Sequence, residues 1–384
     1  MRILLSCLQS RKRHAIPAYA FWREYFVEGL HEADHEIVEV PGVDWAEGLV
    51  HPAGPAHEEW RARTWDATLK FVRLETAERP IDLFLSYLYP RQVETSAIAD
   101  LRKSGIPCVN FYCDNVREFS RIPDEYRAFD LHWVPEFEAL PLYRKAGLAF
   151  LHAPMPCWVP PALRTLPEWE TQGPSFIGSA DALRRSLFGQ AIMAGADLDL
   201  YGVGWQADST KSKTVPPPRS VPRILRNQIE MARRHGPDAL VAKLCNWLQP
   251  LHIVPIPDER IRGAVSGTDY VRISREATVT IGVNRVSSAW ARDRKPLTYS
   301  RLRDIEAPML GACYLTEHTA GLERLYEIGA EIETYRTPEE MVQKLARLTG
   351  DAPRRRRMRE AAQRRALAEH SVSRTLASIM DALS

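Results

Sequence analysis

The sequence lacks the cysteine pattern of a disulfide framework or a structural zinc site. It has only 6 cysteines in 384 residues. They are scattered, with no CxxC pair and no histidine at ligand spacing. We therefore expect neither disulfides nor a metal site, and reduced thiols of a cytoplasmic protein are the simplest explanation.

Long apolar runs and an excess of one charge are also absent. No run approaches the roughly 20 apolar residues needed to cross a bilayer, and the first residues lack the apolar region of a signal peptide. Lys plus Arg is 51 and Asp plus Glu is 49, a net charge of +2. We predict a cytoplasmic protein without a transmembrane segment and without a nucleic-acid partner. Neither GxGxxG nor a Walker A sequence occurs, which disfavours ordinary dehydrogenases and P-loop enzymes.

What the sequence does contain is an alternation of short apolar strands and longer amphipathic helices. Such alternation predicts right-handed βαβ units and a mainly parallel sheet. A proline-rich connector near residues 154–161 interrupts it, so we predict an α/β fold of two Rossmann-like domains with an interdomain cleft and C-terminal helices. The domains are 1–160 and 161–384. Predicted strands are 2–6, 36–40, 81–86, 105–112, 130–134, 175–178, 198–202, 278–283, 312–316 and 331–335; predicted helices are 56–78, 92–104, 136–146, 181–194, 299–309, one beginning at 337, 351–369 and 373–383.

Two segments stand outside this alternation in composition. Residues 206–252 form a predicted helical insertion with apolar and basic side chains. Packing within the second domain is one interpretation; contact with a partner, an acceptor, a membrane surface or a second copy of the chain is the other. An arginine-rich run at 354–365 is expected to form a solvated helix face.

The first candidate site follows the strand at 175–178. Gly178 and Ser179 precede a helix whose N-terminal amides favour a phosphate, and Arg184 or Arg185 would add a bidentate contact to a diphosphate. The alternative is structural: a tight turn at Gly178, a helix cap at Ser179 and two solvated arginines.

The second candidate lies at the helix that ends near residue 309. Arg303 and Glu306 are three residues apart and share one helix face. A carboxylate there accepts both hydroxyls of a ribose, whereas the alternative is a surface ion pair. Asn284 and Arg285 end a strand on the same side, where they contact phosphate or sugar or else form a structural turn.

Two residues of the first domain are candidate bases. Asp114 follows a strand and would deprotonate or orient an acceptor hydroxyl, although it also fits a turn cap. His14, in the loop after the first strand, is the second choice.

Several of these segments, taken in order, resemble CgeB-like (spore maturation type) glycosyltransferases. They are FIGS at 176–179 with Arg184 and Arg185, LYGVGW at 200–205, GTDYV at 267–271, IGVN at 281–284, RDIE at 303–306 with Gly311, and Glu369–His370. The likeness covers about residue 174 to the C-terminus. In the first half of the chain, the segments that contain Gly105 and Asp114 resemble the same family more weakly.

The resemblance implies a GT-B fold in which the second domain holds a nucleotide-sugar donor without a metal or other cofactor. Glu306 matches the position at which enzymes of the glycosyltransferase family 4 type hold the donor ribose. Those enzymes often carry a second Glu eight positions upstream, where this chain has Thr298, so retention of anomeric configuration is not implied. The expected activity is that of a hexosyltransferase-type enzyme (EC 2.4), with a glycan, protein or small molecule as acceptor. The alternative is a catalytically silent nucleotide-sugar-binding scaffold.

Overall fold

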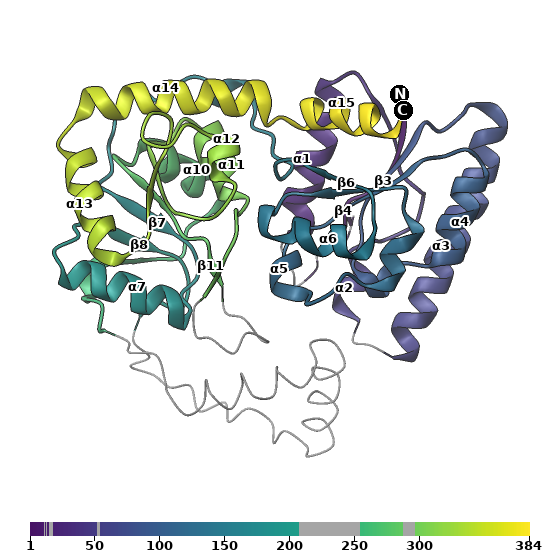
Figure 1. Cartoon of the computed structure of the whole chain (residues 1–384), viewed down its shortest axis with the longest axis horizontal. Helices are drawn as coiled ribbons and strands as arrows, with labels where there is room; N and C mark the ends of the chain where they lie inside the picture. The colour runs from purple at the N-terminus through teal and green to yellow at the C-terminus, as the bar shows by residue number, and fades with distance from the viewer. Residues whose placement is uncertain (11, 13, 15–17, 52–53, 207–253, 287–295) are drawn as a thin grey trace, which may run out of the picture. The chain divides into compact units, whose positions relative to one another are not determined.

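The structure, a computed structural model, describes residues 1–10, 12, 14, 18–51, 54–206, 254–286 and 296–384. The chain divides into two compact units (Figure 1). The first comprises Met1–Asn115, Arg121–Val159 and Ala368–Ser384, and the second comprises Val116–Ser120 and Pro160–Leu367. Within the described ranges, no helix has both the length and the apolar character needed to span a bilayer.

The first unit is built on a six-stranded sheet in which every neighbouring pair is parallel. The strand order is β2-β1-β3-β4-β5-β6. Its strands are β1 (Arg2–Ser6), β2 (Glu36–Val38), β3 (Leu83–Tyr87), β4 (Cys108–Phe111), β5 (Leu131–Val134) and β6 (Phe150–His152). Its helices are α1 (Ala18–Glu32), α2 (Glu47–Val50), α3 (Pro55–Glu78), α4 (Thr95–Lys103), α6 (Leu140–Ala146) and α15 (Val372–Leu383), with α5 (Asn115–Glu118) at the change between units and 3-10 turns η1 (Pro90–Gln92), η2 (Asp124–Ala128) and η3 (Phe137–Ala139).

The last helix of the chain, α15, packs in the first unit against α1, β5 and β6. A close approach at Gly29 permits this contact, because a Cβ built on Gly29 would lie 2.7 Å from the Cβ of Val372. The sequence analysis grouped this helix with the second domain. Helical periodicity located the element correctly, but the glycine that receives it is more than 300 residues earlier in the chain.

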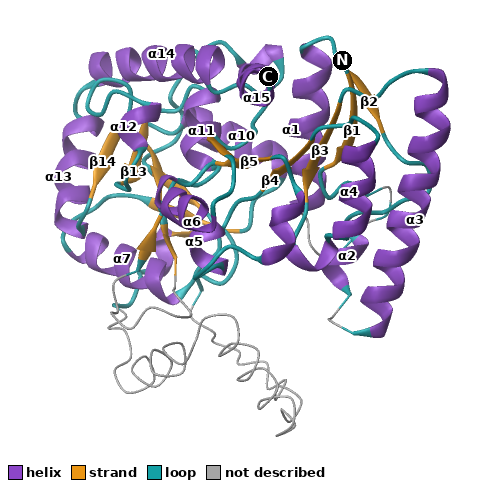
Figure 2. Cartoon of the chain, turned by 45° about the vertical axis from the view of Figure 1, so that its right-hand side comes forward, coloured by secondary structure: helices purple, strands orange, loops and turns teal. Residues whose placement is uncertain are grey.

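The second unit repeats the design with the strand order β14-β13-β10-β7-β8-β9, again wholly parallel. Figure 2 shows these strands in orange with helices around them. The strands are β7 (Ser175–Ile177), β8 (Asp199–Tyr201), β9 (Ile261–Gly263), β10 (Thr280–Gly282), β13 (Tyr314–Glu317) and β14 (Glu333–Tyr335), with an antiparallel pair β11 (Arg285–Val286) and β12 (Leu297–Thr298). The helices are α7 (Ala182–Met193), α10 (Gly267–Glu276), α11 (Arg303–Met309), α12 (Leu322–Leu325), α13 (Pro338–Thr349) and α14 (Ala352–Glu369), with 3-10 turns η4 (Pro161–Leu163) and η5 (Asp258–Arg260).

Strand alternation divides the core of this unit between the two faces of the sheet. Phe176 packs with Leu187 and Phe188 of α7 and with residues of α13 and α14. Its neighbour Ile177 packs on the other face with Tyr201 and with Ile273 of α10. The hydrophobic effect therefore fixes which face of the sheet receives each helix.

The prediction of an α/β fold with parallel strands is confirmed, and the structure adds elements that the sequence analysis missed. Among these are helices α1 and α10 and strands β6 and β9. Helix α11 begins at Arg303, four residues later than predicted. Most of the predicted insertion, 207–252, lies outside the described residues, as do the contacts proposed for it.

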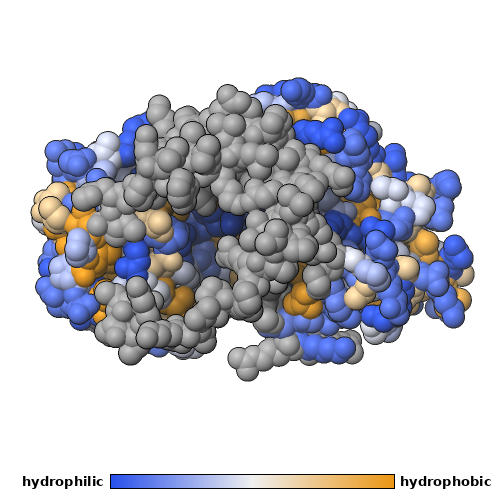
Figure 3. Space-filling model, turned by 90° about the horizontal axis from the view of Figure 1, so that it is seen from below, coloured by the Kyte–Doolittle hydropathy of each residue, from blue (hydrophilic) through white to orange (hydrophobic). Residues whose placement is uncertain are grey.

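The arginine-rich run on α14 is not uniformly a solvated face. Arg355 and Arg359 are buried. Both contact the carboxylate of Glu170, and Arg359 also donates to the carbonyl of Arg275 at 2.6 Å. The expectation of a solvated face was wrong for these two residues, because their guanidinium groups join α14 to the rest of the unit. On the face seen in Figure 3, the described surface is mostly hydrophilic, with apolar residues in small groups.

Candidate functional site

Gly178 and Ser179 lie at the carboxyl edge of the second sheet, directly after β7. The Gly178 amide donates to the carbonyl of Tyr201 at 2.8 Å, and its own carbonyl accepts from Nε1 of Trp205 at 2.7 Å. A Cβ at Gly178 would lie 2.8 Å from Cζ of Phe176. At Gly202, where φ is +131°, a Cβ would lie 2.3 Å from the Gly178 oxygen. The two glycines are therefore required by the protein's own packing, which holds the Gly178 backbone in a fixed position.

Helix α7 begins with a side-chain cap that the sequence analysis placed at the wrong residue. Asp181, rather than Ser179, accepts from the Arg184 amide at 2.9 Å. The Arg184 guanidinium turns back and donates to the Ser179 carbonyl at 2.8 Å, with its Cζ 5.6 Å from the ring centre of Phe176. Arg184 is thus beside the Gly178–Ser179 turn.

Arg185 points to a different segment from Arg184. Its guanidinium donates to the carbonyl of Gly204, and its Cζ lies 6.0 Å from the ring centre of Trp205. Through these two contacts, Arg185 connects helix α7 to the loop that follows β8.

Arg303 and Glu306 of α11 reach the same edge of the sheet. Arg303 donates to the carbonyl of Ile177, the last residue of β7, and its Cζ lies 6.0 Å from the ring centre of Phe176. Tyr270 of α10 links the two residues. Its ring centre is 5.1 Å from the Arg303 Cζ, and its hydroxyl donates to Glu306. Gly178 and Glu306 are therefore on one side of the second unit.

Positive charge accumulates at this edge. Burial lowers the pKa of Arg184, Asp181 opposes the shift, and the charges of Arg301 and Arg303 lower the pKa further. Asp181 pairs with Arg184 at 3.4 Å and Glu306 adjoins Arg303, so three guanidinium groups face two carboxylates, and the remaining positive charge favours an anion. The sequence analysis did not include Arg301, although the spacing of arginines at 301 and 303 before a helix was visible.

Asn284 and Arg285 belong to a buried network next to these arginines. Nδ2 of Asn284 donates at 2.9 Å to Asp304, which lies between Arg303 and Glu306 in sequence but points into the core. Arg285 pairs with Glu317 at 2.6 Å. Burial raises the pKa of Asp304, although hydrogen bonds from Tyr314 and other donors oppose this shift. These contacts are those expected if Asn284 and Arg285 support the fold, the alternative to their contacting phosphate or sugar.

In the first unit, the candidate bases follow two different strands. Asp114 comes after β4, is half-buried, and has a φ of 66°. The next residue, Asn115, is fixed by Glu136 and Tyr143, which are 2.8 Å and 2.9 Å from it. His14 comes after β1, and its Nε2 lies 3.0 Å from the carboxylate of Asp44. The sequence analysis did not identify Asp44.

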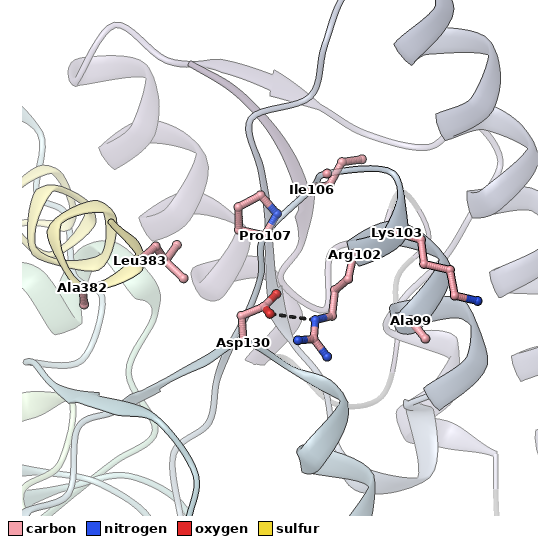
Figure 4. A pocket seen from close by; sticks show the side chains of 9 residues that line it. Ala99, Arg102, Lys103, Ile106, Pro107, Asp130, Ala382 and Leu383 are labelled. Atoms are coloured by element: carbon pink, nitrogen blue, oxygen red, sulfur yellow. Dashed lines mark ion pairs between the residues drawn. The ribbon is translucent and has the colours of Figure 1, made fainter.

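A surface pocket of the first unit lies at the opposite, amino-terminal edge of its sheet (Figure 4). Its main charged groups, Arg102 and Asp130, are paired with each other at 2.7 Å. It therefore has no connection with the candidate bases. In the parts of the chain that the structure describes, no three His, Cys, Asp or Glu side chains are grouped as a metal ion requires.

Two units, each built on a wholly parallel six-stranded sheet, define the class: this is the GT-B fold of glycosyltransferases. The chain belongs to the family described as glycosyl transferase-like, whose model matches residues 184–381. No curated protein matches the chain.

Solved glycosyltransferases share the fold at low sequence identity. The sucrose-phosphate synthase of Thermosynechococcus elongatus is 13% identical with a TM-score of 0.56, and the match covers 100% of this chain and 98% of that one. Anabaena Alr3699/HepE, solved with UDP and glucose, is 10% identical with a TM-score of 0.54, covering 99% of each chain. AviGT4, involved in Avilamycin A biosynthesis, is 12% identical with a TM-score of 0.52, covering 100% of this chain and 96% of that one.

Proposed function

We propose that the protein transfers a sugar from a nucleoside diphosphate-sugar to an acceptor hydroxyl, as a hexosyltransferase-type glycosyltransferase. The observation that carries this proposal is the convergence of Gly178–Ser179, Arg184, Arg303 and Glu306 at one sheet edge. Guanidinium groups recognise a pyrophosphate, and a carboxylate accepts from the vicinal hydroxyls of a ribose. The spacing of positive and negative groups therefore fits a nucleotide with its phosphates at the arginines and its ribose at Glu306.

We also propose that the chain is related to CgeB-like enzymes and, through the position of Glu306, to glycosyltransferase family 4. Thr298 stands where family 4 enzymes often carry a second Glu. The relation therefore supports the donor site without implying retention of configuration. UDP and UDP-glucose are the first ligands to test, because Anabaena Alr3699/HepE was solved with both.

The transfer is proposed to need no metal ion. Negative charge develops on the leaving diphosphate, and the preorganised charges of Arg184, Arg301 and Arg303 stabilise it. The rate of transfer should be unchanged in excess EDTA. A loss of activity that Mg²⁺ or Mn²⁺ restores would contradict this part of the proposal.

The acceptor side is assigned to the first unit, with Asp114 and His14 as the candidate bases. A glycan, a protein or a small molecule would supply the hydroxyl. Loops at the carboxyl edge of a sheet vary freely on a constant fold, so the fold itself does not name the acceptor.

The direct test is donor turnover. The protein is incubated with UDP-, GDP- and dTDP-sugars, with and without a set of acceptors, and released nucleotide is measured by chromatography. We expect release of one nucleotide above the level of a protein-free control. Tight nucleotide binding without release under any acceptor would instead favour the scaffold function, and absence of binding would contradict the donor site.

A further inference from the structure

One tyrosine of the second unit contacts both of the α11 residues that the proposed donor site uses. Tyr270 lies near the start of α10, and its hydroxyl donates to Oε2 of Glu306. The centre of its ring is 5.1 Å from Cζ of Arg303. The hydroxyl and the ring of Tyr270 therefore contact different residues, and a substitution by phenylalanine separates the two contacts.

The position of Tyr270 is fixed by its helix and by the core. Its amide donates to the Ser266 carbonyl at 2.8 Å, and Oγ of Ser266 caps the helix by accepting from the Asp269 amide at 3.2 Å. The ring packs against the cluster that contains Ile177 and Ile273. The hydrogen bond between Tyr270 and Glu306 is therefore made and broken by rotation of the longer Glu306 side chain.

A second tyrosine–carboxylate contact on the same helix shows what is particular to this one. Tyr314 donates to Asp304 at 2.9 Å, and both residues are wholly buried. Tyr270 and Glu306 are half-buried at the carboxyl edge of the sheet. A hydrogen bond in that position can be exchanged for bonds to water and to a ligand, whereas breaking the buried one would leave polar groups unsatisfied.

A ribose that binds Glu306 with both of its hydroxyls must exchange with this tyrosine. A carboxylate accepts from two vicinal hydroxyls with its two oxygens, one hydroxyl on each. One of those oxygens, Oε2, already accepts from Tyr270. The ribose hydroxyl that takes Oε2 therefore replaces an existing hydrogen bond, and only the hydroxyl on the other oxygen adds one.

We propose that Tyr270 is a specificity-determining residue of the donor site, whose hydroxyl holds the place of one ribose hydroxyl on Glu306 until a nucleotide displaces it. The inference rests on the proposed glycosyltransferase function. On binding, the Tyr270 hydroxyl turns to water and a ribose hydroxyl donates to Oε2 in its place. The consequence is unequal recognition of the two ribose hydroxyls. The one that takes Oε2 contributes nothing net, so the donor class includes nucleoside diphosphate-sugars whose deoxyribose lacks that hydroxyl and keeps the other.

The test is titration calorimetry with UDP, 2′-deoxy-UDP and 3′-deoxy-UDP, or with the same series of whichever nucleotide the turnover assay releases. The unaltered protein should bind one deoxy form within about 3-fold of the ribonucleotide and the other about 10- to 30-fold more weakly. In Tyr270→Phe the ring stays on Arg303 and the hydroxyl is lost. This variant should bind the ribonucleotide about 10-fold more tightly than the unaltered protein does, and both deoxy forms more weakly than the ribonucleotide.

Two controls separate this exchange from an effect on the fold. The tolerated deoxy form should bind the unaltered protein and Tyr270→Phe alike, because it does not need Oε2. Tyr201→Phe is the matched variant, since Tyr201 belongs to the same cluster and its hydroxyl lies 3.4 Å from Oε1 of Gln172. It should leave the affinity for all three nucleotides unchanged.

Several results would overturn the proposal. They are an equal loss of affinity for both deoxy forms in the unaltered protein, no gain for the ribonucleotide in Tyr270→Phe, or weaker binding of all three nucleotides by that variant, which is the result of a structural role. A different result identifies failure of the donor site itself. If no nucleotide binds the unaltered protein, or if Glu306→Ala binds all three nucleotides as the unaltered protein does, the ribose is not at Glu306.

Discussion

Glu306 is the residue whose role in nucleotide binding can be tested most sharply. If its carboxylate accepts from the ribose hydroxyls, Glu306→Ala removes hydrogen bonds to a charged group, each of which contributes about 1.5–3 kcal/mol. Tyr270 already donates to this carboxylate in the structure. Part of the binding free energy from the ribose hydrogen bonds is therefore offset by the loss of the Tyr270 hydrogen bond. We therefore expect the Kd for UDP to rise by about 10- to 30-fold, toward the lower end of that range.

The assay is titration calorimetry with two ligands, UDP and its 2′,3′-dideoxy form. Removing both ribose hydroxyls should weaken binding to the unaltered protein but make little further difference in the variant. Glu339→Ala is the matched control, because Glu339 is an exposed acid in the first turn of α13. An equal loss for UDP and dideoxy-UDP, or no loss at all with the fold intact, would refute the assignment of the ribose to Glu306.

Three further substitutions test the charges of the structure. Arg184→Ala should weaken UDP binding by more than it weakens UMP binding in calorimetry, because the guanidinium faces the position proposed for the diphosphate. Arg359→Ala leaves Glu170 and several buried carbonyls without their donor, so urea denaturation should show a loss of about 3–5 kcal/mol in the free energy of unfolding. Burial lowers the pKa of His132 to about 4. Below pH 6.5 the His132 imidazole binds a proton in the unfolded chain, whereas in the folded chain it stays neutral down to about pH 4. The free energy of unfolding should therefore fall by roughly 3 kcal/mol between pH 6.5 and pH 4. His132→Gln should remove that part of the pH dependence in denaturation curves.

Elements with strong local signals were predicted from the sequence nearly to the residue. The last three helices were expected from residue 337, at 351–369 and at 373–383, and are found at Pro338–Thr349, Ala352–Glu369 and Val372–Leu383. Thr337 caps the first of them, accepting from the Glu340 amide at 3.2 Å. Caps and helical periodicity act within a few residues, so the sequence alone determines them.

The elements that were missed differ in the strength of their signals. Helix α1 carries Trp22, Phe26 and Leu30 on one buried stripe, a helical spacing that the sequence analysis overlooked. Strand β9 is an edge strand of three residues with an exposed arginine at its centre, Arg262. No periodicity can be detected over three residues, so its place in the sheet depends on pairing with β8.

The candidate site shows the same division between local and distant contacts. The shared face of Arg303 and Glu306 follows from their i,i+3 spacing and was predicted. The contact of Tyr270 with Glu306 joins residues 36 positions apart, and that of Asp44 with His14 joins residues 30 apart. Such contacts depend on which strands become neighbours in the sheet, and nothing in a single sequence states that order.

The arginines of the second unit show why residue type alone does not identify a ligand site. Arg355 and Arg359 looked like a solvated charge run, yet Glu170 and buried carbonyl groups satisfy them within the fold. Arg184 looked similar in sequence; burial lowers its pKa, Asp181, which pairs with it at 3.4 Å, opposes the shift, and Arg301 and Arg303 add to it. A cluster of like charges is costly to assemble unless an anion joins it, whereas a compensated arginine contributes to stability without a ligand. Position in the fold is what distinguishes the two sets: Arg184 and Arg303 contact the end of β7 and the turn after it, whereas Arg355 and Arg359 join α14 to the rest of the unit.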